Sequence, residues 1–117
     1  MAQLPNYLRS HRKRLALSQD EVAFLLGTLS GAKVNRHERF VREPSLLAAL
    51  GYAAIFGKSV TELFAGLYSR IETQVVTRAK ILANRIQRGR PNARAVCKRQ
   101  AIINLATRLA DKPLSRP

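Results

Sequence analysis

The sequence predicts an all-α fold. Apolar residues recur at helical spacing along the 117-residue chain, with no sustained alternation of apolar and polar residues and no Asn-Gly or Asp-Gly hairpin turn. Aromatic residues make up only 6% of the chain and tryptophan is absent, whereas apolar residues reach 46%. This composition favours helices packed through Leu, Ala, Val and Ile over a β-sandwich. The length fits one small domain with an appended segment.

Two short helices are expected first. The first should cover about residues 6–16, with Leu15 facing inward. The second begins after Ser18, because Ser18 and Glu21 form a capping-box pattern, and it ends at Gly27, which tolerates a positive φ. Its expected buried side consists of Val22, Phe24, Leu25 and Leu26.

A third and a fourth helix follow after short connections. Ser30 is the expected N-cap of the third helix, which has Val34 as its inward anchor and runs to about Arg39. A proline then interrupts the helical conformation, and Ser45 after it caps a fourth helix over residues 46–56.

The next capping signal completes a small domain. Ser59 and Glu62 repeat the capping-box pattern ahead of a fifth helix. Residues 6–66 therefore predict five short helices, and we assign residues 1–66 to one all-α domain.

Residues 67–117 predict a basic helical extension. Apolar spacing continues in a long helix to about Arg88, and a last helix should cover about residues 93–110 after the break at Gly89-Arg90-Pro91-Asn92. The apolar stripe of these helices must be buried against the domain, against a second chain, or on binding a partner. We favour a dimer contact.

The charge of the chain is strongly positive and unevenly distributed. The sequence holds 21 lysines and arginines against 7 acids, a net charge of +14. Residues 1–57 contain 8 of these cations and 4 acids, whereas residues 58–117 contain 13 and 3, and no acid lies between Glu72 and Asp111. Such an excess attracts polyanions, nucleic acid first and an anionic membrane surface second. No run approaches the roughly 18 apolar residues that a membrane span requires.

The sequence gives no sign of catalysis. Two histidines, a single cysteine (Cys97) and acids placed at helix ends supply no set of nucleophile, base and orienting group. No glycine pattern of a Walker or dinucleotide site is present. We expect no enzyme activity, no metal and no cofactor. The lack of a signal-peptide pattern and of a second cysteine predicts a cytoplasmic protein. Its expected attraction to nucleic acid would associate it with the nucleoid.

One group of residues follows a familiar order and spacing. The group comprises Arg12, Leu17-Ser18-Gln19, Val22-Ala23, Leu26-Gly27, Val34, Glu38-Arg39, Pro44-Ser45 and Glu62-Leu63. It resembles the lambda-repressor-like helix-turn-helix domains, the XRE/Cro class of bacterial and phage regulators, over about residues 6–66. The resemblance implies a sequence-specific regulator of transcription that binds double-stranded DNA, acting as a dimeric repressor on a palindromic site.

The resemblance also implies which residues contact DNA. Gln19, at the start of the second helix, would offer its amide to a phosphate, and the third helix would read the major groove. Arg36 is the best candidate for reading a base, because a guanidinium bonds O6 and N7 of guanine together. The implied DNA-contacting set is Gln19, Ser30, Gly31, Ala32, Lys33, Asn35, Arg36, Arg39 and Arg42. Arg12 and Glu38 would form a structural ion pair between the first and third helices.

Three features depart from the family pattern. Gly27 and Thr28 both precede Leu29, which makes the turn one residue longer than usual. Gly31 and Ala32, which we expect to be exposed, offer no side-chain hydrogen bond to a base. Phe40 replaces a usual glycine, and because a bulky residue is costly at positive φ, we expect the third helix to end differently.

Other functions stay open from the sequence. The chain is alternatively an antitoxin-like or bridging module that holds an acidic protein partner through residues 67–117, or a nonspecific architectural binder of DNA or RNA. The lack of aromatic residues interleaved with basic ones disfavours stacking on single-stranded bases. The basic tail is either a solvated face or a set of added phosphate contacts, and we expect His37 beside the groove or on the surface.

Overall fold

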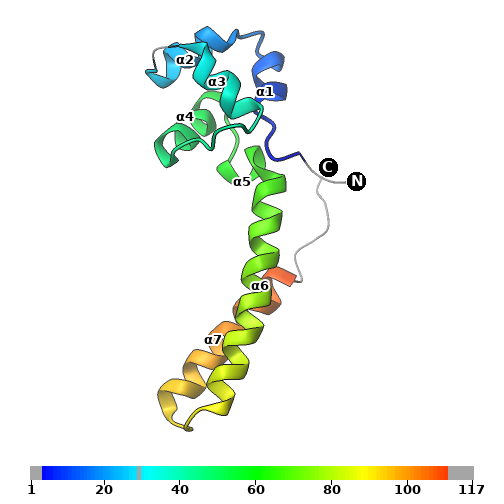
Figure 1. The fold of residues 1–117 in the computed structure, drawn as a ribbon, viewed down its shortest axis with the longest axis vertical. Coiled ribbons are helices and arrows are strands. Elements are labelled where there is room, and N and C mark those ends of the chain that lie inside the picture. Colours follow the sequence, from blue (N-terminus) through cyan, green and yellow to red (C-terminus); the bar gives the residue numbers. More distant parts are fainter. Residues whose placement is uncertain (1–3, 29, 111–117) are drawn as a thin grey trace. The chain divides into compact units, whose positions relative to one another are not determined.

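The computed structural model describes residues 4–28 and 30–110, which form helices joined by short connections (Figure 1). Within the described residues the helices are α1 (Leu8–Arg14), α2 (Gln19–Leu26), α3 (Gly31–Glu38), α4 (Leu46–Phe56), α5 (Val60–Leu63), α6 (Ala65–Arg88) and α7 (Ala93–Ala110). The predicted all-α class is confirmed. The chain divides into two compact units, Met1–Tyr68 and Ser69–Pro117, so that their boundary lies within α6.

The first unit has one apolar core. It is built from Leu8, Val22, Ala23, Val34, Ala49, Tyr52, Leu63 and Phe64, which are contributed by α1 to α5 and the residue after α5. The segment before α1 is tied to the end of the unit by two backbone hydrogen bonds. Tyr7 N donates to Leu63 O (2.8 Å), and Gly66 N donates to Leu4 O (3.1 Å). The first five helices therefore enclose a shared interior rather than forming a string of separate turns.

The predicted caps determine where most of these helices begin. The Ser18 hydroxyl accepts from Glu21 N (3.0 Å), and Ser18 N donates to the Glu21 carboxylate (2.8 Å). Ser59 and Glu62 form the same capping box ahead of α5, and Ser45 accepts from the backbone at the start of α4. Two helices end at glycines of positive φ, namely α2 at Gly27 (79°) and α4 at Gly57 (65°).

Two other helices end at non-glycine residues in the left-handed region. α1 ends before Ala16, whose φ is 58°, and α3 ends before Phe40, whose φ is 55°. Phe40 N donates to His37 O and Val41 N donates to Arg36 O, both at 3.0 Å. These two bonds satisfy carbonyls at the helix end and offset the cost of the left-handed residue. Our expectation that Phe40 would make the third helix end differently was wrong.

Three apolar side chains expected inside the first unit lie on its surface. Phe24 is 82% exposed, Leu25 56% and Leu15 51%. α2 is buried through Val22 and Ala23 instead. Since successive helical residues are about 100° apart, an inward face centred on these two residues turns positions 24 and 25 toward solvent.

The second unit consists of the greater part of α6 and all of α7. Both helices end where the sequence predicts, at Arg88 and at Ala110, and Figure 1 shows α7 running in the opposite direction to α6. Asn92 caps α7 by accepting from Ala95 N (2.8 Å). Only small residues of α6 are buried, and none of α7 is. None of the helices in residues 4–28 and 30–110 is long and apolar enough to cross a membrane.

α2 and α3 are in close contact at Gly31. Its backbone N–H donates to Asp20 Oδ1 (2.9 Å). Ser30 is the N-cap residue of α3, as predicted, but its side chain makes no capping hydrogen bond. A Cβ atom at position 31 would lie 2.5 Å from Asp20 Oδ1 and 2.9 Å from Asp20 N and from Gln19 C. Gly31 is buried, and its predicted exposure is wrong.

We expect Gly31→Ala to lower the free energy of unfolding by about 1–3 kcal/mol, because the new methyl group would overlap backbone atoms of α2. Urea unfolding measures the change. Gly89→Ala is the control, since a Cβ there comes no closer than 3.5 Å to another atom, and its effect should stay within about 0.5 kcal/mol. Equal stability of the two variants would contradict the close approach.

Candidate functional site

The outward side of α3 is cationic. Lys33 and Arg36 are exposed, and Arg39, the C-cap residue, is exposed as well. The inward side is fixed by Val34 and His37, which are both buried. The acid of this helix, Glu38, has a side chain only 3% exposed. α3 therefore presents lysine and arginine to solvent without an acid among them.

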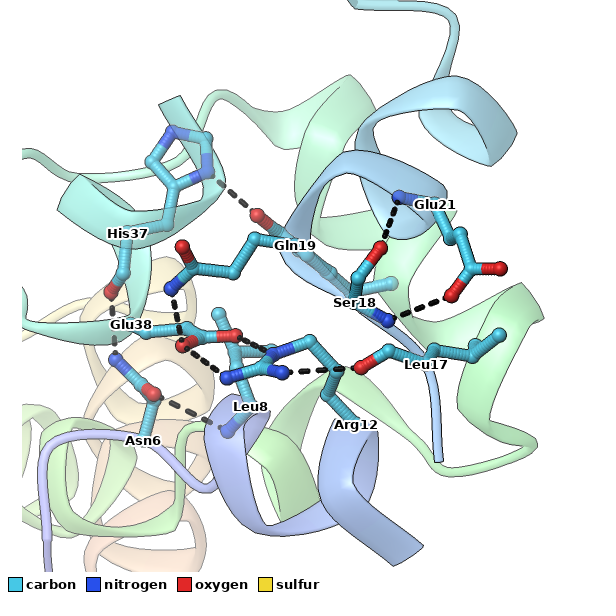
Figure 2. A network of polar contacts seen from close by, with 10 residues as sticks. Asn6, Leu8, Arg12, Leu17, Ser18, Gln19, Glu21, His37 and Glu38 are labelled. Atoms are coloured by element: carbon cyan, nitrogen blue, oxygen red, sulfur yellow. Dashed lines mark hydrogen bonds and ion pairs between the residues drawn. The ribbon is translucent and has the colours of Figure 1, made fainter. Parts of the chain in front are cut away.

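A buried ion pair between Arg12 of α1 and Glu38, the last residue of α3, holds these two helices together (Figure 2). The Arg12 guanidinium binds the Glu38 carboxylate through two hydrogen bonds. Nε donates to Oε2 at 2.5 Å, and Nη2 donates to Oε1 at 3.2 Å. Its third nitrogen, Nη1, donates to Leu17 O (3.0 Å), and Gln19 Nε2 donates to Glu38 Oε1 (3.1 Å). The network therefore joins α1, the start of α2 and the end of α3.

The chemistry of this network makes it rigid. A bidentate arginine–carboxylate pair is geometrically specific, and every donor it uses is directed at a defined acceptor. The Arg12 side chain is only 12% exposed, so water cannot replace either partner easily. The pair predicted from the family resemblance is present, and it positions the cationic side of α3.

Two further side chains, those of Asn6 and Tyr52, bond to α3 at its buried residue His37. The buried Asn6 side chain donates from Nδ2 to His37 O (3.0 Å) and accepts at Oδ1 from Leu8 N (3.1 Å). His37 Nδ1 and the Tyr52 hydroxyl share a hydrogen bond of 2.7 Å, and their rings meet edge to face. These contacts link α3 to the segment before α1 and to α4.

Burial controls the ionisation of the hydrogen-bonded pair His37 and Tyr52. Desolvation lowers the pKa of His37, and the cations Lys33, Arg36 and Arg42 lower it further. Desolvation, with the Glu38 carboxylate nearby, raises the pKa of Tyr52. At neutral pH both side chains are uncharged, so the charge of the site comes from its lysines and arginines.

An open hollow of about 560 Å³ lies beside the ion pair. Its lining residues are Arg9, Arg12, Ser18, Gln19, Asn35, Glu38 and Arg39. Arg9 and Arg39 are exposed and carry charge that is not used in the ion pair. The first residues of α2 also line the hollow, and the N-terminal end of a helix attracts anions. The hollow therefore brings two exposed arginines close to the N-terminal end of α2, beside the paired Glu38 carboxylate.

The structure places the sequence-predicted residues in three environments. Ser30, Ala32, Lys33, Arg36, Arg39 and Arg42 are exposed, Gln19 and Asn35 are half-buried, and Gly31 is buried. The Gln19 amide, expected at a phosphate, instead donates to Glu38. His37 was expected beside the groove or on the surface; it lies in the interior because it bonds to Tyr52.

Sequence reasoning missed Arg9 and Asn6. Arg9 lies three residues before Arg12, which places both on the same side of α1, and this spacing is the signal that would have found it. Asn6 lies two residues before α1, and asparagine is a residue type that favours a side-chain bond to the backbone at the start of a helix.

Neither a metal-binding group of side chains nor similarity to a known protein assigns a function to the described residues. Across the described residues no group of three or more His, Cys, Asp or Glu side chains is placed to hold a metal ion. Comparison of the chain with protein-family models, with curated proteins and with solved structures found no match.

We expect Arg12→Met to lower the free energy of unfolding by about 3–5 kcal/mol, because it leaves the Glu38 carboxylate buried without its cation. The double variant Arg12→Met with Glu38→Gln removes that charge and should recover most of the loss. A double-mutant cycle from urea unfolding measures the coupling. Arg14→Met, at an exposed position of the same helix, should stay within about 0.5 kcal/mol; additive effects of the two buried substitutions would show that no coupled pair exists.

We expect the protein to lose stability as the pH falls below about 6.5, the ordinary pKa of histidine. The pKa of His37 is lowered in the folded state, so the unfolded chain takes up a proton first; stability is full above that pH and declines below it. His37→Gln should make the decline between pH 7 and pH 5 smaller, measured by urea unfolding at each pH. His11, whose pKa is also lowered by burial, accounts for a residual slope. An unchanged slope in His37→Gln would contradict the buried neutral imidazole.

Proposed function

We propose that the first unit is a lambda-repressor-like helix-turn-helix domain and that the chain is a sequence-specific regulator binding double-stranded DNA, a repressor that acts as a homodimer. One observation carries the proposal: a short helix, α3, turns an acid-free cationic side to solvent while buried polar contacts fix its other side. A rigid helix with such a side fits the major groove of B-DNA, which is about 12 Å wide.

Base reading is assigned to the exposed residues of α3. Arg36 would bond O6 and N7 of one guanine, and Ala32 would contact a thymine methyl group. Asn35 is half-buried at the edge of the hollow, which favours a phosphate contact over a base contact. With so few base contacts on one helix, affinity and specificity would come from two half-sites bound by two copies.

Phosphate contacts are assigned to the cations around α3. Arg9 and Arg39 border the hollow at the start of α2, where an anion would also meet the N-terminal end of that helix. Arg42 is exposed in the loop after α3. These groups would fix the orientation of the domain on the duplex without reading its sequence.

The second unit would add sequence-independent attraction. Between residues 73 and 110 it contains no acid and nine cations, namely Arg78, Lys80, Arg85, Arg88, Arg90, Arg94, Lys98, Arg99 and Arg108. Charges of this kind raise affinity for any duplex and make it dependent on salt.

The proposal is tested by selecting bound sequences from a random pool of duplex DNA at about 150 mM salt, where nonspecific attraction is screened. We expect the wild-type chain to recover a motif with two-fold symmetry. Arg36→Ala should lose preference at one base position in each half-site, a cost of about 1–3 kcal/mol there.

Arg14→Ala is the matched control, because Arg14 is exposed on α1 and does not line the hollow beside the ion pair. It should recover the wild-type motif. Recovery of no motif by the wild-type chain would contradict sequence-specific binding, and equal weakening of all sequences by Arg36→Ala would limit Arg36 to a phosphate contact.

A further inference from the structure

α4 exposes a row of leucines to solvent. Leu46 is 72% exposed, Leu47 81% and Leu50 51%, and Ala54 continues the row one turn later. Spacings of three and four residues place these side chains on one side of the helix. The opposite side of α4 is the one that enters the core, through Ala49 and Tyr52.

The apolar surface continues from α4 onto α2. Leu25 and Leu47 line the same open hollow, of about 390 Å³. The two helices touch beside it, since a Cβ added at Gly51 would lie 2.6 Å from the Leu26 side chain. We call the set Leu25, Leu46, Leu47, Leu50 and Ala54 the α4 patch. Scattered apolar residues on a surface need no explanation, but a contiguous group marks an interaction site.

The α4 patch differs from the rest of the chain in charge. No charged residue occurs between Ser45 and Gly57, although the net charge of the chain is +14. The charged residues beside the α4 patch are Lys33, Arg42 and Glu43, which line the same hollow as Leu25 and Leu47. Without a row of cations, α4 offers nothing to the phosphates of DNA and nothing to pair with an acidic protein.

The exposed apolar side chains of α6 lie in a different electrostatic setting. Val75, Ile81 and Leu82 are exposed on this helix, in a part of the chain with nine cations and no acid between residues 73 and 110. Two copies meeting there would bring like charges together, which is costly when the charges are desolvated. Two copies meeting at α4 would bring together the uncharged side of that helix, and the charged residues beside it would be Lys33, Arg42 and Glu43 around the hollow.

We propose that the α4 patch is covered by the α4 patch of a second copy of this chain, in a dimer with two-fold symmetry. A two-fold interface uses the same surface on both subunits, so the patch has to be complementary to itself. An uncharged row of leucines satisfies this condition, because the side chains of one helix fit between those of the other without any charge needing a partner. The dimer contact is thereby assigned to α4 and not to residues 67–117.

The dimer forms part of the proposed function, but the surface through which the two copies meet is tested without DNA. Sedimentation equilibrium of the full chain at about 0.5 M salt, where long-range repulsion is screened, gives the dimer dissociation constant. We expect a dimer for the wild-type chain and at least about a 10-fold higher dissociation constant for Leu47→Glu, as for loss of a residue central to an interface. Leu50→Glu should act in the same direction.

Leu82→Glu is the matched control, because it places the same charge on the exposed apolar side of α6. Each of these glutamates lowers the net charge and therefore lessens repulsion between copies, so weaker association cannot come from overall charge. An unchanged far-ultraviolet circular dichroism spectrum and a cooperative thermal unfolding transition of Leu47→Glu, an exposed position, establish that the variant is folded; its unfolding temperature falls to the extent that the dimer stabilises the wild-type chain.

Dimerisation that is weakened by Leu47→Glu and Leu50→Glu and retained by Leu82→Glu supports the α4 contact. A wild-type chain that stays monomeric, or a dimer lost in Leu82→Glu and kept in Leu47→Glu, overturns it. A monomer that nevertheless selects a DNA motif would overturn the α4 contact and the dimer while leaving sequence-specific DNA binding intact.

Discussion

The buried ion pair between Arg12 and Glu38 is the constraint on which the candidate site depends. Glu38 has an almost fully buried carboxylate, and a buried charge is stable only when paired and hydrogen-bonded. Arg12 supplies two donors and Gln19 a third, so the carboxylate is satisfied by groups from α1 and from the start of α2. Because Arg12 also holds Leu17 O, the connection between these two helices is fixed by the same guanidinium. The position of α3 follows from this geometry.

The remaining contacts of α3 explain why its solvent side is free to be cationic. Asp20 holds its first turn, and Asn6 and Tyr52 hold its last. All of these partners lie on the inward side, so the lysine and arginine side chains of α3 have no structural task within this network. The second unit differs in kind, since it buries few side chains and carries a dense positive charge. The first unit thus holds the helix whose position is fixed by specific contacts, and the second unit holds most of the net positive charge.

Local signals in the sequence predicted the helices well, because capping is decided by residues three positions apart. The capping boxes at Ser18 and Ser59, and the bounds of α4 and α7, follow from such signals. Contacts between helices were harder to predict from the sequence. Gly31 and Asp20 meet across a turn, so Asp20 bonds a backbone N–H at the start of α3, where the Ser30 side chain makes no capping bond, and Gly31 is buried although we expected it to be exposed. Likewise, the exposure of Phe24 and Leu25 depends on which side of α2 meets α4, which periodicity in an apolar run does not specify.

The central claim is that α3, held by the ion pair, forms the DNA-binding surface. It is tested most directly by recording backbone amide chemical shifts of the full chain while adding duplex DNA at about 150 mM salt. The account predicts that the largest changes fall on Lys33, Arg36 and Arg39 and on the first turn of α2, with smaller changes in α6 and α7. Changes confined to α6 and α7, with α3 unaffected, would contradict it and assign the contact with DNA to the basic second unit.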